Sequence, residues 1–160
     1  MDSGLYKALL VAHIIAAIVG VGAIFMNVLF MKDAMDREVG PGFAVLQASL
    51  RVTMVAEKLV YLILVSGLAM VWASDGDIAF SDAWVWLSIV TFVAWMACSH
   101  GVLIPTQRAM VREMRLAAEK DRAPDAAMLK GRERRARAVT PVMHTLLAVL
   151  VVLMVWKPGA

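Results

Sequence analysis

Residues 8–30 read ALLVAHIIAAIVGVGAIFMNVLF, and His13 and Asn27 are the only strongly polar side chains among them. A bilayer hydrocarbon core about 30 Å thick is crossed by roughly 20 helical residues. This stretch therefore predicts a membrane-spanning helix, and three further apolar stretches follow it. The four helices are expected at about residues 5–31, 53–73, 83–105 and 138–156. The expected fold is all-α, a four-helix transmembrane bundle that forms one domain over residues 1–160.

The composition points to a membrane protein with little soluble mass. Hydrophobic residues make up 61% of the 160 residues, whereas a soluble domain is nearer to half apolar. The single cysteine, Cys98, excludes an internal disulfide. The first apolar stretch is longer than the core of a signal peptide, and no Ala-x-Ala cleavage site follows it, so we expect it to be retained as a helix.

The connections between the helices differ in charge. Residues 107–137 hold ten Lys or Arg and five Asp or Glu, whereas residues 74–81 hold no Lys or Arg. The positive-inside rule therefore predicts that residues 107–137 are cytoplasmic and that both termini lie outside a bacterial inner membrane. The interleaved acidic side chains argue against a nucleic-acid partner, so the lipid bilayer is the expected partner.

Glycine and proline mark the expected ends of the helices. Residues 40–42, Gly-Pro-Gly, are not expected to continue a helix, so residues 32–42 are predicted to be a loop. Residues 107–137 are expected to form cytoplasmic extensions of the third and fourth helices. These extensions are expected to turn at residues 123–125, because Pro124 suits the first turn of a helix.

All three histidines lie in apolar stretches, where an imidazole is costly and points to function. A helix rises 1.5 Å per residue, so His100 lies about 9 Å and His144 about 5–6 Å to the cytoplasmic side of the middle of its helix. Two imidazoles at one level on two helices of a bundle suit a b-type haem, so His100 and His144 are the predicted axial ligands. Gly101, Ala97 and Ala148 are adjacent to them or one turn away and leave room for a flat macrocycle.

His13 lies about 7–8 Å to the outer side of the middle of the first helix. Small residues share its helix face, and they suit either a close helix neighbour or a planar ligand. We expect His13 to line a second, outward site for a second haem or a quinone. Met70 lies at a matching depth and is an alternative axial ligand. Helix tilt leaves open which two of the three histidines pair.

Two other interpretations of the histidines remain open. A buried imidazole can hydrogen-bond to a carbonyl or hydroxyl group and bind nothing more. A zinc or copper site needs three or four clustered ligands. Cys98 is a poor third ligand, because it lies about 160° around the helix from His100.

A few polar and aromatic side chains lie near the expected membrane interfaces. Trp84 and Trp86, at the start of the third helix, are typical of an interfacial aromatic belt. For Glu57 and Lys58 we expect interfacial anchoring by long side chains, and the alternative is that Glu57 faces the bundle and carries protons. Asn27 is expected to cap a helix or to bridge within the bundle.

Four motifs are spread along nearly the whole chain. They are LVAHIIAAIVGVGAIF with its His13, the Trp84 that opens the third helix, Pro105-x-Gln107-Arg108, and the C-terminal Met154-Val155-x-Lys157-Pro158. In these motifs the chain resembles a family of small predicted integral membrane proteins of unknown function. More distantly, its first helix is similar to that of CopD-like copper-resistance proteins and of the haem-binding membrane protoporphyrinogen oxidases. The resemblance to the oxidases implies haem binding, with His13 and His100 at the positions of two of their histidines.

The expected function is one-electron transfer by a membrane-embedded b-type haem protein, with a quinone as a further cofactor. Such a protein would be an oxidoreductase of cytochrome b type. The alternative is a non-catalytic accessory or scaffold subunit of a larger membrane or respiratory complex, since the chain is small and its loops are short. A homo-oligomer is compatible with both.

Overall fold

The protein, examined as a computed structural model, is described over residues 3–159, without the side chain of Val28. The helical segments are α1 (Gly4–Ala16), η1 (Ala17–Val21), α2 (Gly22–Met35), α3 (Val39–Trp72), α4 (Ala83–Cys98), η2 (Ser99–Leu103), α5 (Ile104–Glu119) and α6 (Ala126–Trp156). They join into four continuous helices that are long and apolar enough to cross a membrane, and no strand occurs within the described range. The predicted all-α four-helix bundle is confirmed. Residues 1, 2 and 160 of the predicted domain lie outside the described residues.

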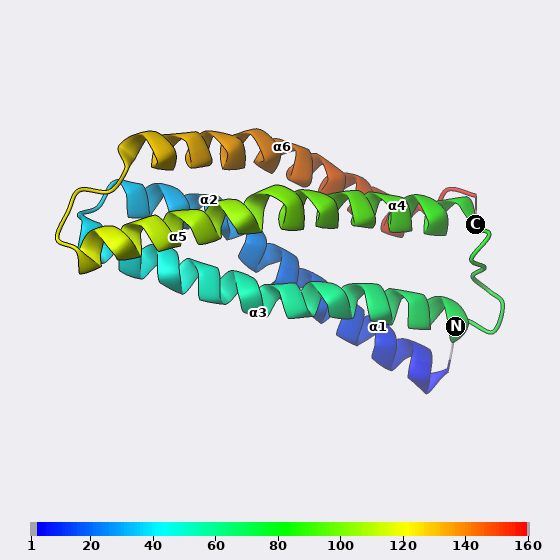
Figure 1. The fold of residues 1–160 in the computed structure, drawn as a ribbon. Coiled ribbons are helices and arrows are strands. Elements are labelled where there is room, and N and C mark those ends of the chain that lie inside the picture. The colour runs from blue at the N-terminus through cyan, green and yellow to red at the C-terminus, as the bar shows by residue number, and fades with distance from the viewer. Residues whose placement is uncertain (1–2, 160) are drawn as a thin grey trace.

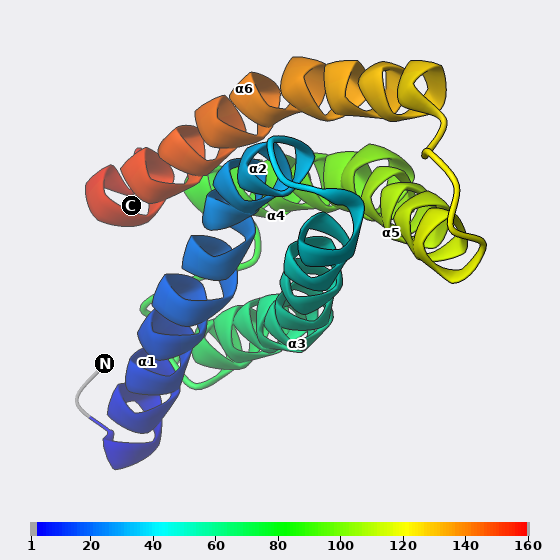
Figure 2. The same ribbon diagram turned by 90° about the vertical axis from the view of Figure 1, so that its left-hand side faces the viewer.

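The four helices run up and down between two ends of the bundle (Figure 1). The start of α1, the end of α6 and the acidic α3–α4 connection lie at one end, which we call the acidic end. The α2–α3 and α5–α6 connections lie at the other, which we call the basic end. Figure 2 shows α1 beside α3, and α4 beneath α6. In the acidic half of the bundle the backbones of α3 and α4 diverge, whereas α3 lies close to α5 in the basic half.

The N-terminus of α3 corrects one prediction. The helix begins at Val39 and runs through the Gly-Pro-Gly triplet, which was expected to lie in a loop. Pro41 is tolerated because the first turn of a helix needs no amide donor there. Gly42 is needed for packing, because a Cβ atom on it would lie 2.5 Å from the carbonyl oxygen of Ala34. The connection between α5 and α6, which also lies at the basic end, agrees with the prediction, since it contains residues 123–125.

Two of the four long helices contain one π-helical turn each, and the second of these turns includes His100. Pro105 has no amide hydrogen, so the carbonyl group of Gly101 cannot receive the usual helical bond from it. The helix adapts by widening, and the Ile104 amide bonds to Ser99. Such turns re-aim the side chains that follow them. Pro141 also lacks an amide hydrogen, but α6 stays α-helical through it, and Figure 2 shows α6 curving along its length.

A buried polar network joins α2, α3 and α5 in the basic half of the bundle. Asn27, Ser49, Thr53 and Gln107 are each at most 4% exposed. The Asn27 amide donates to the Thr53 hydroxyl at 2.5 Å, Ser49 donates to Asn27, and the Gln107 amide donates to Ser49 at 3.0 Å. In hydrocarbon an unpaired polar group costs several kcal/mol, so this network sets how the three helices align. The predicted bridging role of Asn27 is confirmed.

Candidate functional site

The three histidines lie in three separate environments. His100 lies against α3, His144 lies against α2, and His13 lies against the acidic half of α3. Within residues 3–159 no hydrogen bond or ring contact joins any two of them. Each environment therefore has to be judged by its own chemistry.

His100 is the centre of a cluster of protonatable side chains, which we call the Glu57–Tyr61–His100 cluster. A carboxylate oxygen of Glu57 lies 2.5 Å from Nε2 of His100. The Tyr61 hydroxyl lies 2.8 Å from the same nitrogen. On the opposite side of the ring, Nδ1 of His100 lies 3.0 Å from the carbonyl oxygen of Met96. Both ring nitrogens are therefore engaged.

The chemistry of these contacts is that of an acid–base pair. The Met96 carbonyl can only accept a hydrogen bond, so Nδ1 of His100 is the donor in that contact. Nε2 of His100 therefore faces the Glu57 carboxyl group, 2.5 Å away. A carboxyl group and an imidazole in direct contact can pass a proton between them.

The cluster lies on the outer face of the bundle. The side chain of His100 is 38% exposed and that of Glu57 is 12% exposed, and Tyr61 is also exposed. A Cβ atom on the adjacent Gly101 would meet no atom within 4 Å, so there is open space beside the ring. By helical rise, Glu57 and His100 both lie about 9 Å from the middle of their membrane spans. The cluster therefore faces hydrocarbon, where a carboxyl–imidazole pair is costly and marks function.

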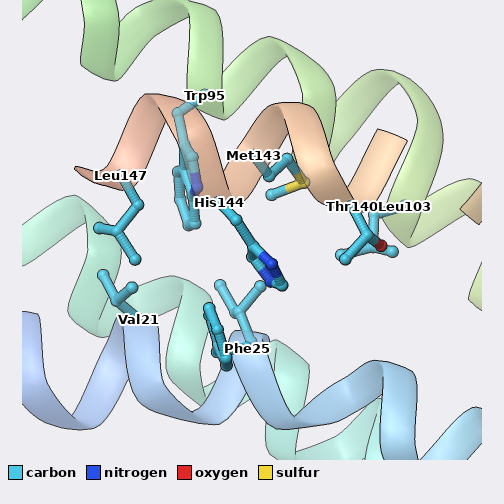
Figure 3. Close-up of a pocket in the computed structure, with 9 residues that line it drawn as sticks. Val21, Phe25, Trp95, Leu103, Thr140, Met143, His144 and Leu147 are labelled. Carbon is cyan, nitrogen blue, oxygen red and sulfur yellow. The ribbon is translucent and has the colours of Figure 1, made fainter. Parts of the chain in front are cut away.

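His144 lies in an apolar cavity between α6, α4 and the first long helix (Figure 3). Its ring stacks on that of Phe25, with ring centroids 3.9 Å apart and planes at 21°. The cavity measures about 20 Å³, which holds about one water molecule. Trp95, Met143 and Leu147 also line it. Neither ring nitrogen of His144 has a hydrogen-bond partner among the described residues, so they remain available as donors, acceptors or ligands.

His13 is held by Ser66 and lies over Gly67. The Ser66 hydroxyl donates its one hydrogen to the carbonyl oxygen of Leu62 at 2.6 Å. It must therefore accept from Nδ1 of His13, which lies 3.0 Å away. In neutral His13 this leaves Nε2 with a free lone pair. A Cβ atom on residue 67 would lie 3.2 Å from the imidazole, so glycine there makes room for the ring.

The predicted ligand pair His100 and His144 is not brought together. The nitrogens of His100 are bonded to α3 and to its own helix, and the cavity beside His144 is far smaller than a macrocycle. In this arrangement the residues do not fit a haem held between these two rings. Ala97 and Gly101 lie exposed near His100, and Ala148 lies exposed on α6. Haem binding itself stays a prediction.

The alternative metal ligands are also dispersed. Met70 packs beside the cluster of Tyr6, Ile78, Trp84 and Val85 at the acidic end. Within residues 3–159 no three His, Cys, Asp or Glu side chains come together as a metal site would require.

Sequence reasoning missed the partner of His100. Interfacial anchoring was expected for Glu57, and this is wrong, because its carboxylate is mostly buried against His100. The depth comparison that paired the histidines would also have placed Glu57 and His100 at one level. That signal was available, but it was not applied to carboxylates.

Comparison with known families identifies the chain at the level of its family. A family model described as "Predicted integral membrane protein (DUF2269)" matches residues 7–158. The chain belongs to this family. No curated protein and no solved structure matches the chain. The DUF2269 match confirms the resemblance to a family of integral membrane proteins of unknown function, and it agrees with a multi-pass protein in contact with the bilayer. The more distant similarity to CopD-like proteins and to the oxidases stays a prediction.

Proposed function

We propose that this chain is a membrane redox protein that exchanges hydrogen with a lipid-soluble quinone at the Glu57–Tyr61–His100 cluster. The observation that supports the proposal is the direct contact between the Glu57 carboxyl group and the His100 imidazole, 2.5 Å apart, on the outer face of the bundle. A quinone dissolved in the bilayer reaches such a face directly. Its two carbonyl oxygens accept hydrogen bonds of the kind that a tyrosine hydroxyl and a protonated imidazole donate.

The chemistry of the cluster suits quinol oxidation. Oxidation breaks two O–H bonds and releases two protons and two electrons. The Glu57–His100 pair accepts a proton from the bound headgroup, while Tyr61 holds a headgroup oxygen. The second proton leaves through the same pair after the first has been released. The two electrons require a one-electron acceptor, and a partner subunit with a redox centre would supply it.

Quinone binding to the purified protein in detergent tests the proposal. Short-chain ubiquinone and menadione are the probes, and quenching of tryptophan fluorescence is the readout. We expect His100→Ala to weaken binding more than ten-fold, Glu57→Gln to weaken it less, and Tyr61→Phe to weaken it by the value of one hydrogen bond, about five-fold. His144→Ala is the matched control, because no quinone role is assigned to that ring, and it should bind as the wild type does. Equal affinities of the His100→Ala and His144→Ala variants would contradict the proposal.

A second candidate is one-electron transfer by a b-type haem that His144 binds. It is favoured by one observation: among the described residues, neither ring nitrogen of His144 has a hydrogen-bond partner in the cavity that Phe25 and Trp95 help to line. The cavity would have to widen, and curvature at Pro141 makes α6 the helix that could move. Haem added during expression should then produce a Soret band that His144→Ala removes and His100→Ala preserves. No band in the wild type would eliminate this candidate.

The orientation and partners of the chain belong to the same proposal. We propose a bacterial inner-membrane location with the basic end in the cytoplasm, supported by the charge difference between residues 107–137 and 74–81. Attachment to a larger respiratory complex, or to a second copy of this chain, would supply an electron-transfer partner. Labelling of single cysteines placed at residues 77 and 121 tests the orientation. Only the first should react with an impermeant reagent added outside intact cells.

A further inference from the structure

Arg108 contacts the thioether of Met54 on the outer face of α3 and α5, and two further cations lie on the same face of α3. A guanidinium nitrogen of Arg108 lies 3.3 Å from the Met54 sulfur. Arg51 and Lys58 lie three residues before and four residues after Met54, and this spacing places them on the same face of α3. All three cations are exposed. We call them the Arg51–Lys58–Arg108 group.

Unlike the arginines that form ion pairs, these three cations have no carboxylate partner among residues 3–159. Arg37, Arg115, Arg122 and Arg137 each form an ion pair with an acidic side chain. No such pair involves Arg51, Lys58 or Arg108 within the described residues, and the nearby Glu57 carboxylate is engaged by His100. A thioether is a weak acceptor. The group therefore has positive charge that the protein leaves uncompensated.

The level of the group in the membrane indicates which kind of anion would bind to it. Met54 lies at the basic-end boundary of the apolar span of α3, so the level of the group is that of the lipid headgroups. Lys58 is one turn deeper, and its side chain can extend back to that level. A phospholipid phosphate at this boundary would contact all three cations, while its acyl chains follow the apolar face toward Tyr61. Basic pockets between helices at a membrane boundary bind anionic lipids in this way.

We propose that the Arg51–Lys58–Arg108 group is a binding site for the phosphate of an anionic phospholipid. The site is separate from the Glu57–Tyr61–His100 cluster and does not depend on the function proposed for that cluster. Arg51 and Met54 lie about one to two turns from Glu57 toward the basic end of α3, and Lys58 directly follows Glu57, so a bound lipid would border the quinone site.

Native mass spectrometry of the full chain in detergent tests the site. The probes are dioleoylphosphatidylglycerol, dioleoylphosphatidylcholine and inorganic phosphate at equal concentrations. We expect tighter binding of phosphatidylglycerol than of phosphatidylcholine. Each cation near a membrane surface contributes about five-fold in affinity for anionic lipid. Arg108→Gln should therefore weaken phosphatidylglycerol binding about five-fold, and Arg51→Gln combined with Arg108→Gln about 25-fold.

The control is Arg134→Gln, which removes the same charge from an exposed position on α6. It should change binding less than two-fold. Arg108→Lys keeps the charge and should restore most of the affinity, which separates a binding defect from a folding defect. An equal loss in Arg134→Gln, equal binding of the two lipids, or displacement of the lipid by millimolar phosphate would each overturn the proposal.

Discussion

The ammonium nitrogen of Lys157 lies 5.4 Å from the centre of the Trp84 ring. Lys157 ends α6 in a left-handed backbone conformation with φ 42° and ψ 60°, and Trp84 lies in the first turn of α4. Two motifs that are far apart in the sequence, the tryptophan of the third long helix and the C-terminal Lys-Pro pair, therefore meet at the acidic end. Trp84 is only 6% exposed, so its predicted place in an interfacial belt is wrong. Trp86, which is 58% exposed, agrees with that prediction.

Lys157→Met should lower the stability of the acidic end, because it removes the cation over the ring and keeps the aliphatic length. The expected loss is about 0.5–1 kcal/mol, measured as a lower midpoint of thermal unfolding in detergent. Lys130→Met, on an exposed turn of α6, is the matched control and should leave the midpoint unchanged. Equal midpoints for all three proteins would mean that the contact contributes nothing.

Gly42→Ala should destabilise the basic half of the bundle. The new methyl group would lie 2.5 Å from the Ala34 carbonyl oxygen, so the α2–α3 connection would have to move, at a cost of about 1–3 kcal/mol. Gly40→Ala is a control two residues away, where a methyl group meets no atom within 4 Å. It should be neutral or slightly stabilising in the same thermal assay. A drop of equal size in both variants would point to backbone effects instead of the contact.

Gln107→Leu should disrupt the buried polar network. Ser49 and Thr53 would each lose one hydrogen bond, and a hydrogen bond contributes about 0.5–1.5 kcal/mol net. Both hydroxyl groups would keep their bonds to Asn27. Gln47→Leu makes the same chemical change at a half-buried position of α3. We expect a large fall in unfolding midpoint for the first variant and little change for the second. The opposite order would show that the network does not stabilise the fold.

Gly67→Ala should displace the His13 ring. The methyl group would lie 3.2 Å from the ring carbon between the two nitrogens, so the bond between Nδ1 and Ser66 must lengthen or break. We expect a nitrogen-15 NMR spectrum in which the His13 tautomer is no longer held as Nδ1–H. Gly22→Ala has no atom within 4 Å and should keep the wild-type spectrum. An unchanged His13 signal in Gly67→Ala would show that the ring does not need glycine at residue 67.

Hydropathy and charge along the chain were sufficient to predict the architecture. Apolar length predicted four spans, and basic residues predicted the extensions that form α5 and the first half of α6, because both properties are local. The start of α3 could not be predicted in this way. Glycine and proline usually interrupt a helix, but here the close approach of Ala34 and the donor-free first turn favour helix over loop.

The sequence by itself determined that the three imidazoles belong to apolar segments long enough to span a membrane, and it predicted their depths from the rise along each helix. Tertiary structure decided which way each ring points. Helix rotation of about 100° per residue, the π-helical turn around His100 and the packing of α3 against α5 direct His100 toward Glu57 and Tyr61, while His144 turns to Phe25. The position of a side chain along the membrane normal follows from its place in the helix. The direction in which it points within the membrane plane is set by contacts between helices that are distant in the sequence.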